Sequence, residues 1–361
     1  MRDNAQVVRM MDCEIQAPIE TPDRQLEKRS FRFHGSASEY FGIWLSNILL
    51  TILSLTMYSP WAKSRRLRYF YGNTEFLDRR FDFTGLPSKI FLGRLFALEI
   101  YVVFIFLSNY SVTLTSISFV LLALVVPWLF RLTLKFRSRN SKFGNTRFYF
   151  YGENRYLYRI LIIEILKTIL SCLILLPRLI WLYQHYYFDH LQLGRLKFKF
   201  TAERRMFMKA VYQPLLFFII INILGLWLVF FISNDLSKQF RLLLFIPAIM
   251  ITAAWLFALP YMFAKIYIST WNNLELGQNY FKTRAKPWRY AWIVLTNWVL
   301  RLITLGLFSA WAEIRLYQYK INMLDLYVVD DPDQMNNMLQ QAEPHSVAQE
   351  LSALFDFDAS L

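Results

Sequence analysis

A proline at the end of a long apolar run is followed, at one fixed spacing, by a phenylalanine at four places in this chain. The four pairs are Pro60/Phe81, Pro127/Phe148, Pro177/Phe198 and Pro260/Phe281. In three of these units a glycine stands four positions before the phenylalanine, as Gly144, Gly194 and Gly277. The repeated unit comprises an apolar segment, a basic aromatic stretch and a Phe-x-Phe strand. This pattern predicts a multi-span membrane protein built by internal duplication.

Seven apolar runs approach or exceed the length that a membrane-spanning helix needs. A bilayer requires about 20 mostly apolar residues in one helix, and 56% of the 361 residues are hydrophobic whereas 18% are charged. The runs are residues 40–57, 90–107, 112–130, 160–176, 210–232, 242–264 and 291–308. Four of them contain no charged residue, which disfavours buried helices of a large soluble protein. We therefore predict an all-α polytopic membrane protein with about seven transmembrane helices and internal repeats.

The two ends of the chain differ from the predicted membrane domain, which we place at residues 31–328. Residues 1–30 form a polar tail without the apolar core of a signal peptide. Residues 329–361 form an acidic tail with seven acidic residues and no Lys or Arg. One interpretation of this tail is a short amphipathic helix that docks on the basic part of the chain, and the alternative is a solvated tail. The apolar stripe of that helix would be Val347, Leu351, Leu354 and Phe355.

The charge of the membrane domain points to a lipid surface as the partner. Residues 31–329 hold 35 basic and 13 acidic residues. Such an excess at helix ends is favoured by anionic headgroups and by retention on the cytoplasmic side. Binding of nucleic acid would need the same charge on a soluble face, which the apolar pattern does not offer. We expect a phospholipid membrane as partner, no nucleic acid, and a homo-oligomer as an open alternative.

Each unit continues past its proline with features of the membrane interface. In the first unit the basic and aromatic residues are Trp61, Lys63, Arg65, Arg66 and Arg68. Mixed rings and cations are typical of short interfacial helices. Phe81-Asp82-Phe83 then alternates with the period of a strand. We place such strands outside the bilayer, because an unpaired strand within it could not satisfy its backbone groups.

The spacing of the units suggests an inverted repeat. The interval from Pro127 to Pro260 equals the interval from Pro177 to Ala310, where a fifth unit carries Ala-Trp in place of the proline. Three crossings, repeated once, return in the opposite orientation, as in many secondary transporters. Asn73 and Asn273 would then lie on opposite sides of the membrane. The charge pattern opposes this topology, because it places basic modules on both sides.

Polar residues recur in three of the predicted spans, at the same three positions before the anchor of each unit. They are Asn47, Thr51 and Ser54 in the first span, Glu164, Thr168 and Ser171 in the fourth, and Asn297, Arg301 and Thr304 in the seventh. The steps of four and then three positions keep each set on one helical face. One hypothesis is a polar seam where the three spans meet, with Glu164 opposite Arg301. The alternative is hydrogen bonding that only holds helices together. Arg94, Glu99 and Lys167 are secondary candidates.

The sequence offers no recognisable catalytic chemistry. It lacks the G-x-G-x-x-G, G-x-x-x-x-G-K-[ST], G-x-S-x-G and H-E-x-x-H patterns. His185 and His190 are five positions apart, a spacing that does not bring both rings onto one helical face, so we predict no metal site there. Cys13 and Cys172 provide no disulfide framework. We expect no enzyme activity, no catalytic residues and no cofactor.

The first unit carries a more specific resemblance. Phe31-Arg-Phe-His-Gly35, Glu39-Tyr-Phe41 and Tyr58-Ser-Pro-Trp-Ala-Lys63 are followed by Arg65-Arg-Leu-Arg-Tyr-Phe-Tyr-Gly-Asn-Thr74 and Gly93-Arg94. This region resembles the YjgN-like family of bacterial inner-membrane proteins, a domain family of unknown function. The similarity covers roughly residues 31–328 and is strongest at residues 31–95 and again at Ser309-Ala-Trp-Ala-Glu313. It implies a multi-pass inner-membrane location and supplies no binding residue. Leu77-Asp78-Arg79 stands where a glycine is expected, so the turn there should differ.

Two functional classes follow from these features. A transporter or channel is favoured by the apparent inverted duplication with polar residues at one depth. A non-catalytic membrane scaffold or lipid-binding protein is favoured by the repeated Arg/Trp/Tyr belt and the charged tails. The substrate cannot be read from the sequence, and a water-filled cavity at the level of Glu164 and Arg301 would favour transport.

Overall fold

The computed structural model describes residues 27–235 and 245–329. Most of both predicted tails, including the predicted helix at 347–355, lies outside the described residues. The helices are α1 (Ala37–Leu53), α2 (Ser59–Gly72), α3 (Pro87–Ser108), α4 (Val112–Arg139), α5 (Asn154–Tyr158), the π-helical η2 (Arg159–Glu164), α6 (Ile165–Leu170), α7 (Leu176–Asp189), α8 (Arg204–Asp235), α9 (Phe245–Trp271), α10 (Pro287–Ile303) and α11 (Ser309–Asn322).

Eleven strands form a single antiparallel sheet. They are β1 (Glu27–Ser30), β2 (Arg32–Phe33), β3 (Thr74–Phe76), β4 (Arg79–Phe83), β5 (Ser141–Phe143), β6 (Thr146–Phe150), β7 (Leu191–Leu193), β8 (Leu196–Phe200), β9 (Leu274–Leu276), β10 (Asn279–Thr283) and β11 (Leu324–Val328). The predicted Phe-x-Phe strands are confirmed within β4, β6 and β8. The protein is mostly helical, as predicted, but the all-α class must be corrected because the short strands join into one continuous sheet.

The sheet closes into a ring through its first two strands. Its order runs from β1 through β11 and then backwards along the chain to β2. β1 pairs with β11 and β2 pairs with β3, and only Phe31 separates β1 from β2. The backbone N–H of Phe31 still donates to the carbonyl of Leu324, at 3.1 Å. The segment from 27 to 33 therefore links the first and last parts of the sheet. We call this sheet the strand ring.

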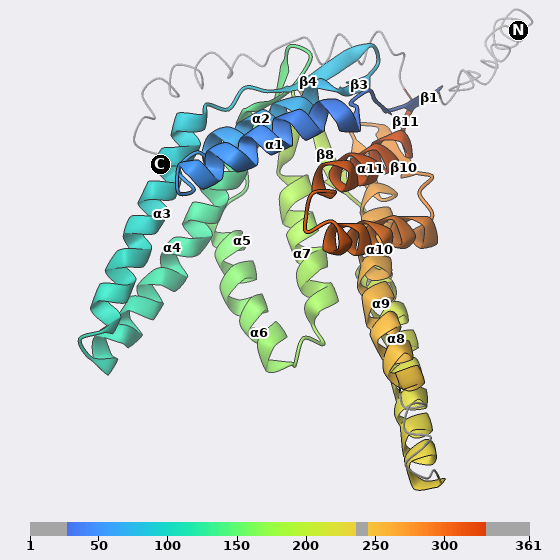
Figure 1. Ribbon diagram of the computed structural model, residues 1–361. Coiled ribbons are helices and arrows are strands. Elements are labelled where there is room, and N and C mark those ends of the chain that lie inside the picture. Colours follow the sequence, from blue (N-terminus) through green and yellow to red (C-terminus); the bar gives the residue numbers. More distant parts are fainter. Residues whose placement is uncertain (1–26, 236–244, 330–361) are drawn as a thin grey trace, which may run out of the picture.

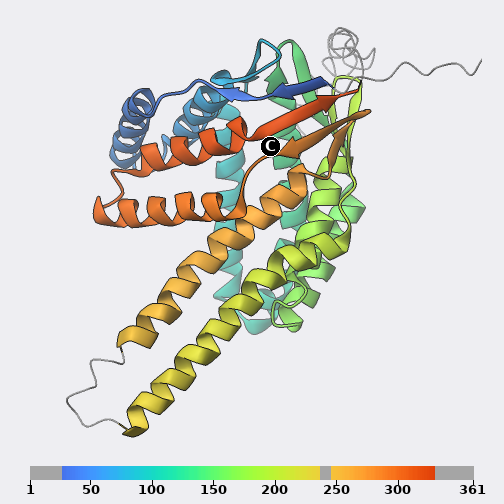
Figure 2. The same ribbon diagram turned by 90° about the vertical axis from the view of Figure 1, so that its right-hand side faces the viewer.

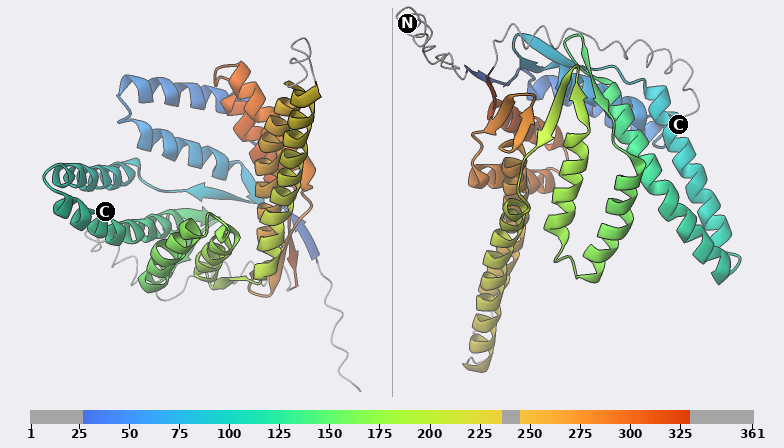
Figure 3. Two further views of the ribbon diagram at one scale, coloured as in Figure 1. Left: turned by 90° about the horizontal axis from the view of Figure 1, so that it is seen from below. Right: turned by 180° about the vertical axis from the view of Figure 1, so that it is seen from behind.

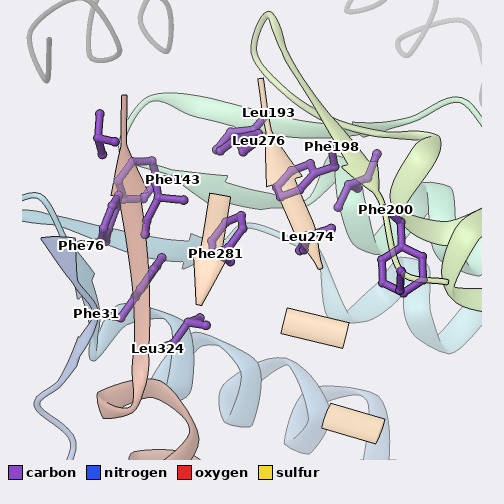
Figure 4. Close-up of a cluster of buried hydrophobic side chains, with 14 of the residues drawn as sticks. Phe31, Phe76, Phe143, Leu193, Phe198, Phe200, Leu274, Leu276, Phe281 and Leu324 are labelled. Atoms are coloured by element: carbon purple, nitrogen blue, oxygen red, sulfur yellow. The ribbon is translucent and has the colours of Figure 1, made fainter. Parts of the chain in front are cut away.

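The interior of the strand ring is filled with aromatic and aliphatic side chains (Figure 4). Phe31 stacks on Phe76 with ring centroids 4.2 Å apart, and Phe281 lies between Phe31 and Phe198 at 6.3 and 6.2 Å. These side chains alternate with charged residues along the strands, as in Phe198-Lys199-Phe200, in which only the lysine is exposed. The period of two thus sends one face of each strand into this core.

A helical hairpin precedes each β-hairpin along the chain, and the one before β7 and β8 is formed by α5, η2 and α6 on one side and α7 on the other. The strands gather at one end of the molecule, and the hairpins α3/α4, α6/α7 and α8/α9 extend away from it, whereas α1/α2 and α10/α11 run across that direction (Figures 1 and 2). Seen from below, the helical hairpins fan out rather than forming a parallel bundle (Figure 3).

The β-hairpins turn where the sequence places glycine or, once, leucine. Gly144, Gly194 and Gly277 have φ of 56°, 59° and 63°, a conformation that costs glycine little. In the first hairpin Leu77 and Asp78 adopt φ of 48° and 54° instead. The missing glycine therefore does not abolish this turn, and two non-glycine residues occupy the left-handed region.

Four helices, rather than the predicted seven, are long and apolar enough to cross a membrane within the described residues. They are α3, α4, α8 and α9. The predicted spans at 40–57, 160–176 and 291–308 each contain a helix end and a tight turn. Pro60 and Pro177 fall in the first turn of the following helix, where a missing N–H breaks no hydrogen bond. Each of these runs is therefore the tip of a short helical hairpin.

The expected inverted repeat is also corrected by the sheet. Asn73 directly precedes β3 and Asn273 directly precedes β9, and both strands belong to the strand ring. None of these strands exceeds five residues, whereas a strand that crosses a bilayer needs about 9 to 11, so the strand ring does not span the hydrocarbon. The two asparagines therefore lie on the same side of any membrane that the long helices cross.

Candidate functional site

The polar residues of the predicted seam lie in three different short hairpins. Asn47, Thr51 and Ser54 belong to the α1/α2 hairpin, Glu164, Thr168 and Ser171 to the hairpin of η2, α6 and α7, and Asn297, Arg301 and Thr304 to the α10/α11 hairpin. The side-chain hydrogen bonds of Asn47, Glu164 and Asn297 stay within their own hairpins. These hydrogen bonds therefore join the two helices of one hairpin and do not connect the three hairpins with each other.

The first and last hairpins make the same contacts. The Nδ2 of Asn47 donates to the carbonyl of Ala62 at 3.5 Å, and the Oδ1 accepts from Arg65 at 3.3 Å. The Nδ2 of Asn297 donates to the carbonyl of Ala312 at 3.0 Å, and its Oδ1 accepts from Arg315 at 3.3 Å. Each asparagine therefore fastens the two helices of its hairpin.

In the hairpin of η2, α6 and α7, the charged Glu164 occupies the position that the asparagines occupy in the other two short hairpins. Its side chain is 3% exposed and forms ion pairs with Lys167 (Nζ–Oε1 3.0 Å) and with Arg178 (Nε–Oε2 3.3 Å). The predicted partner Arg301 does not take part in these pairs. A buried carboxylate is costly unless it is paired, and the two cations satisfy this need locally. Glu164 also ends the π-helical stretch η2, a feature that often accompanies functional positions.

The other predicted residues separate into two groups. Arg94 donates to the hydroxyl of Ser59 and connects α3 with α2. Glu99 is exposed on α3. On α2, Trp61 stacks against Tyr58, and Arg68 donates to the carbonyl of Phe83 at 3.2 Å. Arg68, near the end of α2, therefore lies beside the strand ring, whereas Trp61 lies at the opposite end of that helix, next to the hairpin turn.

A cavity of about 1030 Å³ lies among α2, α3, α4, α7, α10 and α11. Seven cationic side chains and one carboxylate line it. The cations are Lys63, Arg66, Lys89, Arg94, Arg137, Arg301 and Lys320, and the carboxylate is Glu313. The aliphatic and small lining residues include Ile90, Ala97, Leu129 and Leu132. We call this space the basic cavity.

Only part of the positive charge in the basic cavity is neutralised. Arg66 pairs with Glu313 at 3.3 Å, and Glu313 also accepts from the hydroxyl of Tyr40 at 2.7 Å. The Nζ of Lys320 lies 5.4 and 5.2 Å from the ring centroids of Tyr267 and Tyr290, which stabilises a cation without neutralising it.

Lys63 shows the effect of the remaining charge. Withdrawal from water lowers the pKa of its ammonium group, and repulsion by Arg94, Arg137 and Arg66 lowers that pKa further. The Nε of Arg301 is buried and has no hydrogen-bond partner among the described residues. Because like charges repel each other strongly where water is scarce, this arrangement favours an anion in the cavity.

Several cavity residues were missed in the sequence, although a spacing marks them. The same four positions after 60, 127 and 310 line the cavity in each of α2, α4 and α11. They include Arg137, Glu313 and Lys320, which the search for polar residues within spans did not reach. These positions follow the period of an α-helix and share one helical face. The pattern could therefore have identified the face but not the convergence of the three helices.

The described residues form no recognisable site for a metal ion. They contain no group of three or more His, Cys, Asp or Glu side chains placed to hold a metal ion. His185 contacts Asp189 at 2.8 Å, whereas His190 contacts the carbonyl of Tyr186 at 2.8 Å. The two histidines therefore face different partners.

These features define a multi-pass helical membrane protein with a strand ring at one end and a basic cavity among its helices. Residues 28–354 match the family described as bacterial protein of unknown function DUF898, and the chain belongs to that family. The resemblance seen in the first unit is thereby confirmed.

Similar proteins are inner-membrane proteins. The inner membrane protein YjgN of Escherichia coli strain K12 is 33% identical over 104 residues, which cover 29% of this chain and 26% of that protein. The protein of the same name from Salmonella typhimurium strain LT2 is 29% identical over 119 residues, 33% of this chain and 30% of that protein. The matched part is thus about a third or less of these relatives. No solved structure matches. The chain is a bacterial inner-membrane protein, as predicted.

Proposed function

We propose that this protein binds an anionic amphiphile, such as a phospholipid, in the basic cavity. The observation that carries this proposal is the charge of the lining, with seven cations against one carboxylate. Such a surplus raises the local concentration of anions and weakens folding when no anion is present. A lipid-binding protein was one of the two classes that the sequence left open.

The lining favours an amphiphile over a small inorganic anion. Lys89 and Arg94 lie on the same part of α3 as Ile90 and Ala97, so charged and apolar surfaces adjoin. A phosphate group could contact the cations while an acyl chain follows the apolar side of α3 and α4. Both helices are long and apolar enough to cross the membrane, so this apolar side continues toward the hydrocarbon.

The filled interior of the strand ring favours a lateral entrance for the ligand. Phe31, Phe281 and Phe198 stack across the interior of the ring, and Phe143 is 2% exposed there. A straight path along the axis of the ring is therefore filled by side chains. Entry between the helices, from the membrane, fits this geometry better than passage through the ring.

We also infer that four crossings hold the strand ring on the cytoplasmic side. All β-hairpins lie in one sheet, and they carry cations such as Arg80, Lys197 and Lys199. The connection between α3 and α4, by contrast, contains no charged residue. The excess of basic residues on the cytoplasmic side of inner-membrane proteins supports this orientation. With four crossings all basic modules lie on one side of the membrane, whereas seven crossings would place them on both sides.

Lipid binding can be tested by native mass spectrometry of the purified protein with defined phospholipids. We expect phosphatidylglycerol or cardiolipin to bind better than phosphatidylcholine. Changing Lys63→Gln and Arg94→Gln together should weaken binding about a hundred-fold, because each charge-assisted contact contributes roughly 1.5 kcal/mol, or about ten-fold.

The matched control replaces two exposed lysines of the strand ring, Lys197→Gln and Lys199→Gln. It removes the same charge from a surface outside the cavity. Equal losses in both double variants would show that net charge alone attracts the lipid and would contradict a specific site.

Transport of the bound amphiphile is the second candidate function. It is favoured by the contribution of α3 and α4 to the cavity, since a ligand held there adjoins two helices able to cross the membrane. Movement of a labelled anionic lipid between leaflets of proteoliposomes would distinguish transport from binding alone. A scaffold that only holds lipid would bind it without moving it.

A further inference from the structure

The turns of the three short hairpins have the same backbone conformation. Two successive residues with positive φ end the first helix: Leu55 and Thr56, Cys172 and Leu173, and Leu305 and Gly306. Their φ angles range from 48° to 91°. Such residues are uncommon outside glycine, so the same pair at three turns indicates one shared turn geometry.

These turns satisfy their own backbone donors. In the first hairpin, Leu55 donates to Ile52, Thr56 to Thr51, and Met57 to Ser54, at 3.1, 2.7 and 3.1 Å. The corresponding N–H groups at Cys172, Leu173 and Ile174, and at Leu305, Gly306 and Leu307, donate to the equivalent carbonyls.

The remaining donor is taken by a hydroxyl group. The N–H of Tyr58 donates to the Oγ of Ser54 at 2.9 Å. The N–H of Leu175 donates to Ser171 and that of Phe308 to Thr304, at 3.2 and 3.0 Å. A turn with no exposed donor is what hydrocarbon requires, because no water is present there to accept a hydrogen bond.

The side chains at the turns are apolar and exposed. Leu53 and Leu55 are 79% and 85% exposed, and Leu302 and Leu305 are 79% and 93% exposed. Leu170, at the end of α6 in the second short hairpin, is 76% exposed. Large apolar patches of this kind mark a surface that contacts lipid or another apolar partner.

The long hairpins differ at their tips. Ser108, Asn109 and Ser111 surround the turn between α3 and α4, and α8 ends with the sequence Ser233-Asn234-Asp235. Both sequences suit water rather than hydrocarbon. The tips of the long hairpins thus have the chemistry of the far membrane surface, and the tips of the short hairpins do not.

The positions of charged residues set the depth of the short hairpins. Lys63 lies four positions beyond the start of α2, which is about 6 Å along a helix. Arg178 lies in the first turn of α7, and Arg301 lies two positions before the end of α10. Arg131, by contrast, lies well past the middle of α4. The short tips are therefore within about one leaflet, roughly 15 Å, of the interfacial residues.

We propose that the three short hairpins enter the hydrocarbon of the leaflet nearest the strand ring and turn back within it. Their partner is the acyl chains of that leaflet. The protein would then displace more lipid from this leaflet than from the other, which only the long hairpins reach. This inference does not rest on lipid binding in the basic cavity.

Cysteine labelling in intact inner-membrane vesicles of both orientations tests the proposal. Cys172 is an exposed natural probe at one turn, usable after Cys13→Ser. Leu55→Cys and Leu305→Cys place the same residue at the matching turns, where φ is 49° and 48° as at Cys172, 49°. The fold therefore already accepts cysteine in this conformation.

A membrane-impermeant maleimide should label none of the three turns from either side of intact vesicles, because a thiol in hydrocarbon stays protonated and unreactive. The same maleimide should label all three turns once the protein is unfolded in SDS. Lys199→Cys in the strand ring and Tyr110→Cys at the α3/α4 tip are the controls, and they should label from opposite sides. Labelling of the short turns from the side of Tyr110 would show that these hairpins cross. Labelling from the side of Lys199 would show that they lie on the surface. Either result would overturn the proposal.

Discussion

The α3/α4 hairpin and the α10/α11 hairpin begin and end at the same strand ring, yet their tips have opposite chemistry. The first has 22 and 28 residues in its helices and a polar turn. The second has 17 and 14 residues and an apolar turn closed by Thr304. Apolar length alone therefore does not specify a crossing. The position of a self-satisfied turn within the apolar run decides whether the chain passes through the bilayer or returns.

The largest expected effect comes from the charge of Glu164 inside the second short hairpin, formed by η2, α6 and α7. Replacing Glu164 by Gln leaves Lys167 and Arg178 without their shared carboxylate, and we expect the free energy of unfolding to fall by about 3 kcal/mol. Thermal unfolding of the detergent-solubilised protein measures this loss.

Glu99→Gln is the control for that experiment. It removes one carboxylate from the long helix α3, where the side chain is exposed, so its effect should be much smaller. Equal effects of the two variants would mean that Glu164 does not fasten its hairpin, and the polar networks would no longer distinguish short from long hairpins.

An intermediate loss of stability is expected when the hydroxyl group of Thr304 is removed from its turn. Thr304→Val keeps the shape of the side chain but leaves the N–H of Phe308 without its acceptor, and this should cost about 1 to 2 kcal/mol. Thr252→Val on α9 removes a hydroxyl that only donates to the carbonyl of Ala248. That control should be nearly neutral. A neutral result for both variants would indicate that water reaches the Thr304 turn, contrary to its placement in hydrocarbon.

The smallest effect concerns the basic cavity and depends on pH. Because the pKa of Lys63 is lowered in the folded protein, the unfolded chain binds more protons between that lowered pKa and the ordinary value of 10.5. Stability should therefore rise with pH through this window. Lys63→Gln should flatten the rise, whereas Lys199→Gln should not. An unchanged pH profile of unfolding temperature in Lys63→Gln would contradict crowding of positive charge around this residue.

The sequence predicted the membrane class and the Phe-x-Phe strands, because apolar length and side-chain alternation are local properties. The turns within three apolar runs escaped prediction because a hydropathy profile treats Leu55 and Thr56 like any other apolar stretch. Only Gly306 supplied a local signal for such a turn. Ser54 and Thr304 were recognised as polar positions, but their role as acceptors for the turn was not evident.

The basic cavity was predicted less completely. Lys63, Arg66, Arg94 and Arg301 were singled out, but for the interface or for the seam. Their convergence depends on contacts between distant parts of the chain. Phe41 packs on Trp311 with ring centroids 4.6 Å apart, a contact that joins the first and last hairpins. No local pattern contains information about such a contact.

Closure of the strand ring gives the synthesis of this protein a defined last step. Each new β-hairpin can pair with the preceding one as it emerges, but β1 must wait for β11, and the hydroxyl of Ser30 bonds to Asp325 near the other end of the membrane domain. Until then two strand edges stay unpaired, a state prone to association with other chains. Ribosomes must therefore complete nearly the whole membrane domain before β1 can pair with β11. A chain truncated before Leu324 retains both open edges.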